Sequence, residues 1–312
     1  INVDDTGARH DGNNGYCTHI GNEYFAWFKS TQSKSRINFL KLLTTGSGGY
    51  IINEDALEYM RIQKLPKSLL EKLHPYSGKQ FETEKQWAQL LKSLGIENKR
   101  HLRIAIEGGL VGNLIHHGYN RNMAIISDDA GQFNIFLHAL CWVHAERTIH
   151  KLIGFTPKHT ELQEKTRSDI WELYRALKKY QICPSQSQKK ILEAQFDELF
   201  TRQTEWVSLN EALQRIYNNK SELLLVLSRP DIPLHNNLSE NDIREYVKRR
   251  KISGSTRSDS GKLSRDSFTS LKKTCRKLGV SFWEYLRDRI HLRNKIPPLW
   301  EIMTLQMSNA HL

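Results

Sequence analysis

The alternation of apolar and polar residues near the start of the chain indicates a β-meander. Residues 1–6 begin a β-prone run, and the stretch Asp11–Gly15 is rich in turn-forming residues. Two further β-prone runs follow at Tyr16–Ile20 and Tyr24–Lys29. Runs of this length, separated by Gly, Asn and Asp, are typical of strands joined by hairpins. The run Ile37–Leu40 fits either a third strand or the start of a helix.

A second pattern, in residues 124–153, joins a buried strand to a helix. The apolar run Ala124–Ile126 ends just before Asp128 and Asp129. Residues suited to a buried face then recur at helical spacing, at Phe133, Phe136, Leu137, Leu140, Cys141 and His144. This spacing predicts a helix that begins within a few residues of the strand. Because ligands and ions usually bind at the carboxyl ends of strands in α/β sheets, Asp128 is a candidate for an ion site.

Residues 46–122 have mainly helical patterns. After a flexible joint at Thr44–Gly49, Asn53 has the character of a helix start. A further helix is predicted near Glu84–Leu94, with Gly95 ending it. We expect this stretch to be an insertion between sheet elements.

Residues 154–229 are also predicted to be helical. Apolar residues recur at helical spacing in Leu162–Leu177 and Ile191–Leu213, and Pro184–Ser187 separates the two runs. An antiparallel helical pair inserted into a sheet domain accounts for this length of chain.

Residues 230–250 are predicted to be irregular at first, around Pro230–Pro233, and then to begin another helix. Asn237 as the N-cap residue, with Glu240 three positions later, resembles a capping box, which explains both residues without catalysis. The same geometry puts Glu240 on the first helical turn, on one side with Arg244. From these residues alone, capping is favoured over catalysis, because this signature is common at helix starts.

The chain beyond Lys251 is expected to form a loop and two helices. Residues 252–261 are small and polar, which is typical of a flexible loop. The next helix has an apolar stripe formed by Phe268, Leu271, Cys275 and Leu278. Gly279 ends that helix, and residues 281–286 begin another.

The net charge changes the picture from a generic globular protein to one with a polyanionic partner. The 312 residues include 46 Lys and Arg against 34 Asp and Glu, a formal charge of +12, and the basic residues concentrate in 244–277. Such local asymmetry favours a nucleic-acid partner over mere solubility. The candidates for contacts with DNA phosphates are Lys248, Arg249, Arg250, Lys251 and Arg257. A solvated basic face is the alternative explanation.

The cysteines indicate a reducing compartment. The chain has 4 of them without paired spacing, so we expect free thiols. Cys141 and His144 have the spacing of half a zinc site, but no second pair at suitable spacing follows, and zinc wants four ligands. We therefore expect Cys141 to pack in the core and His144 to form a hydrogen bond near the acidic strand ends.

The sequence indicates no membrane segment and no secretion signal. The longest apolar run, Leu223–Leu227, is too short to cross a bilayer, and no basic segment followed by an apolar stretch stands at the N-terminus. We expect a cytoplasmic protein associated with the bacterial nucleoid. The start at Ile1 rather than Met suggests a fragment or a trimmed chain, and whether an upstream domain is missing stays open at this point.

Carboxylates from distant positions, with a basic segment beside the last, suit phosphoryl transfer on nucleic acid. Two divalent ions about 3.5–4 Å apart can activate the attacking oxygen and stabilise the leaving oxygen. Hard ions such as Mg²⁺ prefer the oxygen ligands that Asp and Glu supply. Spacing alone does not select three residues among 34 acids.

Three groups of residues resemble motifs of the IS66-type DDE transposases. Residues 1–6 resemble the strand with that family's first catalytic Asp, at Asp4, although Asp5 stands where Glu is usual. Residues 126–129 resemble the strand with the second Asp, and 141–147 are similar to the CW-x-H-A-x-R helix. Residues 236–244 with the basic and small residues that follow, and then 270–286, keep the order of the family's C-terminal motifs. His235 departs from the family, which usually has an acidic residue there.

The resemblance implies an α/β fold, an RNase H-like mixed sheet flanked by helices. The catalytic core would be discontinuous, with residues 1–45, 123–153 and 230–292 forming it. Residues 46–122 and 154–229 would be largely helical insertions, and 293–312 a C-terminal tail.

The resemblance also implies the chemistry. Asp4, Asp128 and Glu240 would be the catalytic residues and would hold Mg²⁺ or Mn²⁺, with Asp4 and Asp128 sharing the ions. Asn236, Asn237, Cys141 and His144 would support the site without reacting. The substrate would be double-stranded DNA, both element ends and target, bound by a homo-oligomer that assembles on DNA. Water attack would free a 3′-OH, which would then attack target DNA.

Two other functions remain open at this point. One is a catalytically silent DNA-binding protein derived from a transposase, which would bind DNA in a salt-dependent way without cutting it. The other is a nuclease of the same fold, which would hydrolyse DNA but never join it.

Overall fold

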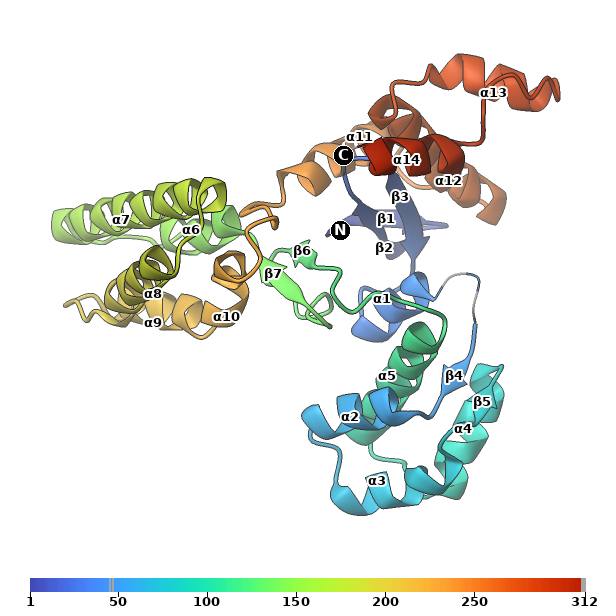
Figure 1. Cartoon of the computed structure of the whole chain (residues 1–312), viewed down its shortest axis with the longest axis horizontal. Coiled ribbons are helices and arrows are strands. Elements are labelled where there is room, and N and C mark those ends of the chain that lie inside the picture. Colours follow the sequence, from blue (N-terminus) through green and yellow to red (C-terminus); the bar gives the residue numbers. More distant parts are fainter. Residues whose placement is uncertain (45, 47, 310–312) are drawn as a thin grey trace.

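A five-stranded mixed sheet lies at the centre of the computed structural model, which describes residues 1–44, 46 and 48–309 (Figure 1). Its strands are β1 (Asn2–His10), β2 (Asn13–Gly21), β3 (Ala26–Thr31), β6 (Ile125–Ser127) and β7 (His138–Leu140). The order across the sheet is β3-β2-β1-β6-β7. The first three strands are antiparallel to one another, whereas β6 runs parallel to β1 and β7 parallel to β6. The predicted meander and the mixed α/β class are confirmed.

The hairpin between β1 and β2 shows why the sequence folds this way locally. Asp11 and Gly12 form its two-residue turn, with φ of 48° and 75°. An Asp-Gly pair with positive φ at both positions gives a turn whose twist matches that of the flanking strands. The run Ile37–Leu40, which fitted a strand or a helix, lies in helix α1 (Arg36–Leu43).

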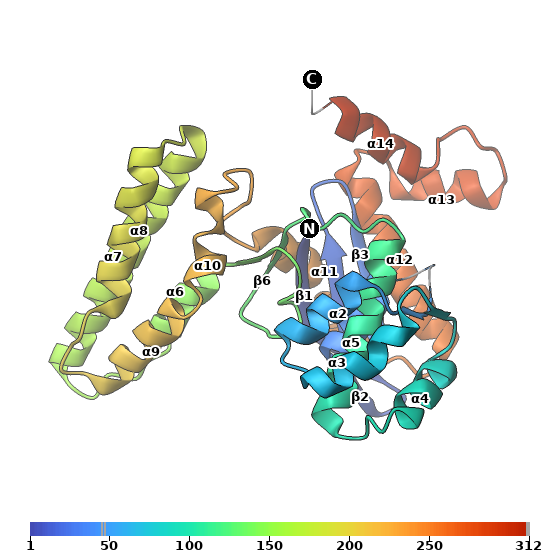
Figure 2. The ribbon, with the colours of Figure 1, turned by 60° about the horizontal axis from the view of Figure 1, so that its bottom comes forward.

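One face of the sheet is covered by α1 and by the helices that follow (Figures 1 and 2). These elements are β4 (Tyr50–Ile51), α2 (Glu54–Ile62), α3 (Lys67–Leu73), η1 (His74–Tyr76), β5 (Gln80–Phe81), α4 (Glu84–Ser93) and α5 (Lys99–His116). Val3, Ile20 and Ile125 of the sheet share one apolar cluster with residues of these helices. The helix starts predicted at Asn53 and Glu84 are confirmed, because Asn53 and Thr83 cap α2 and α4. Of the predicted joint at 44–49, residues 45 and 47 lie outside the described residues.

Five helices and a 3₁₀ turn form a separate arm with its own core, on the left of Figure 1. They are α6 (Trp142–His150), α7 (Pro157–Ile182), α8 (Gln186–Thr201), α9 (Val207–Tyr217), α10 (Lys220–Leu223) and η2 (Leu225–Leu227). The predicted antiparallel pair corresponds to α7 and α8, which Cys183–Ser185 separates. The second predicted run, Ile191–Leu213, is wrong as one helix, because Arg202–Trp206 divides it between α8 and α9. The buried Trp142 ties α6 to this arm, because its indole N–H donates to the Leu223 carbonyl at 2.9 Å.

The opposite face of the sheet is covered by α11 (Asn237–Ser253), and α12 (Asp259–Lys277) lies along β3, whose backbone amides donate to its side chains. The last two helices, α13 (Phe282–Ile290) and α14 (Leu299–Asn309), pack against the end of α12. Ile243 and Tyr246 of α11 pack on Ala8, Cys17 and Phe28 of the strands. This contact holds the middle of α11 against β1, β2 and β3.

Two further predictions along the chain are wrong in detail. Residues 130–137 are not helical, and the helix begins only at Trp142. The apolar residues Phe133 and Ile135 lie in an irregular segment and are buried in the core. After this segment, β7 pairs with β6 before the helix starts. The predicted loop 252–261 is also shorter, because α11 continues to Ser253. The helix α14 lies within the stretch expected to be a tail.

Within the described part of the chain, no helix combines the length and apolar character that a bilayer crossing requires.

Candidate active site

The sheet brings Asp4, on β1, near Asp128, which directly follows the last residue of β6. In the parallel pair of β1 and β6, Asn2 lies opposite Ile126, two residues before Asp4 and Asp128 respectively. The side chain of Asn2 reaches Asn236 beside α11, and that of Ile126 packs against Ile232 on the same side. Because side chains alternate along a strand, Asp4 projects toward that side as well. Asp128 lies just beyond the end of β6, and its negative charge contributes to the raised pKa of Asp4.

The pKa of Asp4 shows that acidic groups surround it. This pKa is raised to about 7, mainly by burial; the negative charges of Asp128, Asp5 and Glu240 also raise it, and a backbone hydrogen bond lowers it. That bond is donated by the Asp5 amide at 2.8 Å. The charge of Asp4 is therefore unfavourable in the folded protein unless a cation or a proton compensates it.

Glu240 lies on the first turn of α11 and faces three basic side chains. Its carboxylate is 3.6 Å from His144 Nε2, 3.7 Å from Arg147 Nη1 and 3.8 Å from Arg244 Nη2. One carboxylate oxygen, Oε1, is buried without a hydrogen-bond partner. The predicted position of Glu240 beside Arg244 is confirmed.

Helix α6 delivers two of these basic residues. The Cys141 amide donates to the Ser127 carbonyl at 2.9 Å, so α6 starts directly beside the end of β6. His144 and Arg147 then follow one turn apart, with Arg147 Nη1 3.3 Å from His144 Nε2. Burial lowers the pKa of His144, although the charges of Asp128 and Glu240 act in the opposite direction.

The start of α11 is organised by Asn236 rather than by Asn237. The N-cap residue is Asn236, and its side chain forms no capping bond. It instead donates to the Val3 carbonyl at 2.7 Å and accepts from Asn2 at 2.8 Å. The prediction that Asn237 is the N-cap is therefore wrong, since the buried Asn236 has the partners that fix the helix to β1. The capping explanation for Glu240 does not hold, because the contacts of its carboxylate are with basic side chains.

Cys141 packs in the core as expected. Its side chain is buried, and its sulfur accepts a hydrogen bond from the Asn236 amide at 3.2 Å. Burial raises the pKa of this thiol, which keeps it protonated near neutral pH.

The side chains of Asp4, Asp128 and Glu240 have the right chemistry for a hard divalent cation, but they do not form a preassembled metal site. Among residues 1–44, 46 and 48–309, no three His, Cys, Asp or Glu side chains lie close enough together to hold a metal ion as they stand. The carboxylates of Asp4, Asp128 and Glu240 are nevertheless the kind of ligand that Mg²⁺ prefers, and Glu240 Oε1 accepts no hydrogen bond. Side-chain movement would have to bring them onto a common ion.

The candidate DNA-binding residues lie on the second half of α11 and just beyond it. Lys248, Lys251 and Arg257 are exposed. Arg249 lies 3.8 Å from Glu245, and Arg250 donates to Thr6 Oγ1 at 3.1 Å and to the Gly7 carbonyl. Arg250 therefore also has a structural contact with β1, which distinguishes it from the three exposed residues.

Sequence reasoning missed two features of the site. One is the contact of Arg147 with Glu240, since the motif at 141–147 includes Arg147 but assigns it no role. The other is the set of contacts that His19 makes with α11. The signal for the second feature was His19, a titratable residue within the β-prone run Tyr16–Ile20.

Comparison with known proteins places the chain in a family. The family described as "Transposase IS66 family" matches residues 71–263, a range that includes Asp128 and Glu240 and does not reach Asp4. The uncharacterized protein y4jO of Sinorhizobium fredii (strain NBRC 101917 / NGR234) is 42% identical over 302 residues, which are 96% of this chain and 94% of that protein. No solved structure matches the chain. With more than half of its residues covered by the family match, the chain belongs to the IS66 transposase family.

Proposed function

We propose that this chain is the catalytic core of a DDE transposase that cuts DNA at the ends of an insertion sequence and joins those ends to target DNA. The observation that carries the proposal is the electrostatic coupling of three carboxylates from the start, middle and late parts of the chain. Asp128 and Glu240 both raise the pKa of Asp4, although 124 and 236 positions separate them from it in the numbering. Membership of the IS66 transposase family supports DNA as the substrate.

The fold supports the same proposal. An order of three antiparallel strands followed by two parallel ones agrees with an RNase H-like sheet, with Asp4 on its central strand. We propose the discontinuous core 1–45, 123–153 and 230–292, with 46–122 and 154–229 as insertions and 293–312 as a tail.

In the proposed mechanism the chain positions DNA and compensates charge. Asp4, Asp128 and Glu240 would hold Mg²⁺ or Mn²⁺, which when bound would activate the attacking oxygen and stabilise the leaving one. The exposed Lys248, Lys251 and Arg257 would bind phosphates of the duplex. Arg147 and Arg244, now beside Glu240, lie where a phosphate near that residue would meet a positive charge. Fixed charges of this kind lower the barrier without reorganisation during the reaction.

A cleavage and joining assay tests the proposal. The substrate is a supercoiled plasmid that carries the genomic sequences on both sides of the gene for this chain. It is incubated with the protein and with Mg²⁺ or Mn²⁺. The proposal expects nicks that leave a 3′-OH and products in which that end is joined to a second DNA. Asp4→Asn, Asp128→Asn and Glu240→Gln should each abolish cutting, whereas Asp231→Asn, at an exposed acid, should not.

One observation favours a second candidate, a DNA-binding protein that does not cut. As they stand, the described residues include no group of three ligands around a metal position. Salt-dependent DNA binding without metal-dependent nicking would support that candidate. Nicking without joining would instead indicate a nuclease of the same fold.

A further inference from the structure

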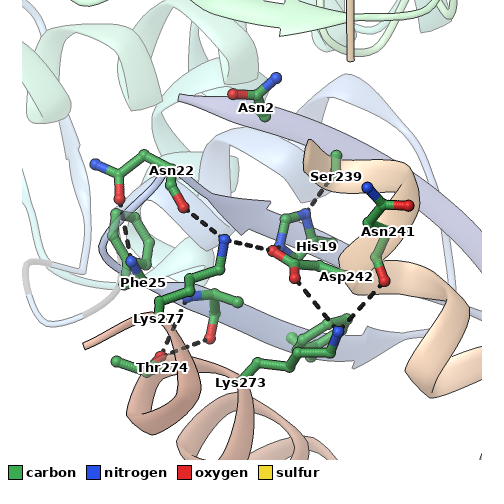
Figure 3. A network of polar contacts seen from close by, with 12 residues as sticks. Asn2, His19, Asn22, Phe25, Ser239, Asn241, Asp242, Lys273, Thr274 and Lys277 are labelled. Atoms are coloured by element: carbon green, nitrogen blue, oxygen red, sulfur yellow. Dashed lines mark hydrogen bonds and ion pairs between the residues drawn. The ribbon is translucent and has the colours of Figure 1, made fainter. Parts of the chain in front are cut away.

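His19 joins strand β2 to both sides of Glu240. Its side chain is fully buried, and Nδ1 lies 2.5 Å from Ser239 Oγ while Nε2 lies 3.3 Å from a carboxylate oxygen of Asp242 (Figure 3). Ser239 immediately precedes Glu240, and Asp242 follows it by two positions. One imidazole ring therefore contacts α11 on either side of the candidate catalytic Glu240.

Helix α12 completes this set of contacts. Lys277 Nζ lies 2.8 Å from the Asp242 carboxylate and donates to the Asn22 carbonyl at 2.7 Å (Figure 3). Lys273 Nζ lies 3.5 Å from the same carboxylate. Burial opposes ionisation of Asp242, but its contacts with His19 and Lys277 lower its pKa overall. We call His19, Ser239, Asp242, Lys273 and Lys277 the His19 clamp.

Strand β2 is shaped to hold the imidazole. A Cβ atom at Gly21 would lie 2.8 Å from His19 Nε2 and 2.6 Å from the Phe25 carbonyl oxygen, so any larger residue would displace the ring or the turn. On the other side, the rings of His19 and Phe28 are 4.9 Å apart. Gly21 and Phe28 therefore limit how far the imidazole ring can move beside α11.

The spacing of the contacts fixes the rotation of α11. Ser239 and Asp242 are three positions apart, so they lie on one face of the helix, turned toward the sheet. Glu240 is displaced from Ser239 by about 100° around the helix axis. A rotation that broke the contacts of His19 would therefore also change the position of Glu240 relative to the strand that carries Asp4.

We propose that the His19 clamp positions Glu240 for metal binding, with His19, Ser239 and Asp242 as positioning residues that do not touch the substrate. The proposal rests on the proposed metal-dependent function of Glu240. Partners that orient metal ligands commonly change metal affinity by about 10–100-fold when they are removed.

The test compares Asp242→Asn with a matched control, Asp266→Asn. Asp266 is also a buried carboxylate that ties a C-terminal helix to the sheet, through the amide of Ser30 at 2.7 Å and its hydroxyl at 2.7 Å. It contacts β3 rather than the first turn of α11. Both variants should lower thermal stability, so stability alone does not separate positioning from structure. Ser239→Ala, which removes only one hydroxyl, serves if Asp242→Asn does not fold.

Two measurements on the full chain give the readouts. Binding of Mn²⁺ is followed by the loss of the electron paramagnetic resonance signal of free Mn²⁺, and backbone hydrogen exchange is followed at residues 237–243. We expect Asp242→Asn to weaken Mn²⁺ binding at least about tenfold and to speed exchange in that turn. Asp266→Asn should leave Mn²⁺ binding within about twofold of the unsubstituted chain, because its contacts do not reach Glu240.

Equal Mn²⁺ affinity in Asp242→Asn, Ser239→Ala and the unsubstituted chain would overturn the clamp. So would unchanged hydrogen exchange at 237–243 in Asp242→Asn. If the unsubstituted chain itself binds no Mn²⁺, the proposed function fails, and the exchange measurement still decides whether the clamp orders the turn that carries Glu240.

Discussion

Asn2 and Asn236 are joined by a hydrogen bond of 2.8 Å between the amide nitrogen of Asn2 and the side-chain oxygen of Asn236. The two residues are 234 positions apart, and both are buried. Asn236 also donates to the carbonyl of Val3, next to Asp4. This pair fixes where α11 begins relative to β1, and therefore how Glu240 stands relative to Asp4.

Removing Asn236 should cost more than removing its partner. Asn236→Ala leaves the Asn2 amide and the Val3 carbonyl without their buried partner, and we expect it to lower the free energy of unfolding by about 2–4 kcal/mol. Asn2→Ala should cost about 1–3 kcal/mol, and the double variant less than the sum. Denaturant unfolding of the four proteins measures the coupling. Strict additivity would show that the pair contributes nothing of its own.

The stability of the metal-free protein should depend on pH through Asp4. Its pKa is raised to about 7, well above the usual value for Asp of about 4, so the folded state binds this proton more tightly than the unfolded state. Stability should therefore fall as pH rises from about 4 to about 7, with the full cost present above pH 7.

Asp4→Asn removes this charge and keeps an oxygen that can accept from the Asp5 amide. Above pH 7 we expect it to stabilise the metal-free chain by on the order of 1–2 kcal/mol, after a discount for the solvent that still reaches Asp4. At pH 4 the two proteins should unfold at nearly the same temperature. Thermal unfolding at both pH values measures this difference, and a constant difference at both would contradict the assignment to Asp4.

Arg147 should compete with a metal ion for Glu240. Its guanidinium lies 3.7 Å from the carboxylate, and the side chain is 44% exposed, so the interaction is screened. Arg147→Gln should tighten Mn²⁺ binding by up to about fivefold, equivalent to about 1 kcal/mol, because a competing cation is removed. The same variant should weaken DNA binding if Arg147 meets a phosphate. Calorimetric titration with Mn²⁺ measures the first effect, and weaker metal binding would show that Arg147 supports the site instead.

The exposed basic residues should act through the salt dependence of DNA binding. Lys248→Ala, Lys251→Ala and Arg257→Ala should each reduce the slope of log K against log salt by about 1. Arg250→Ala should also lower stability, because Arg250 donates to Thr6 and Gly7.

A control for the salt experiment comes from the helical arm. Lys190 is exposed on α8, far from α11 and α12 (Figure 1). Lys190→Ala should leave the slope unchanged. A slope insensitive to all three substitutions near α11 would mean that DNA binds elsewhere on the chain.

Local chemistry made parts of the fold predictable. Features that depend on one or two neighbouring residues can be predicted from the sequence. Examples are the Asp11-Gly12 turn, the cap at Asn53 and the end of a helix before Gly95. The helix predicted over 133–144 was wrong in its first part, because buried residues of an irregular segment can have the spacing of a helix by chance. Asn237 misled it as well, because the partners of the neighbouring Asn236 are on β1 and are distant in sequence.

The candidate site divides in the same way. Asp4, Asp128 and Glu240 were selected by resemblance to a family, and their spacing alone could not have chosen them. The contact of His19 with Ser239 spans 220 positions, so it exists only once β2 and α11 are packed together. The role suggested here for Arg147 depends on its 3.7 Å distance to Glu240, which no local pattern encodes.

Crystals of the chain grown with Mn²⁺ and examined by anomalous diffraction test the central claim most directly. The account predicts an anomalous peak about 2 Å from carboxylate oxygens of both Asp4 and Asp128, with Glu240 bound to the same ion or to a second one beside it. A peak held by other residues, with Asp4, Asp128 and Glu240 directed into separate regions, would contradict it.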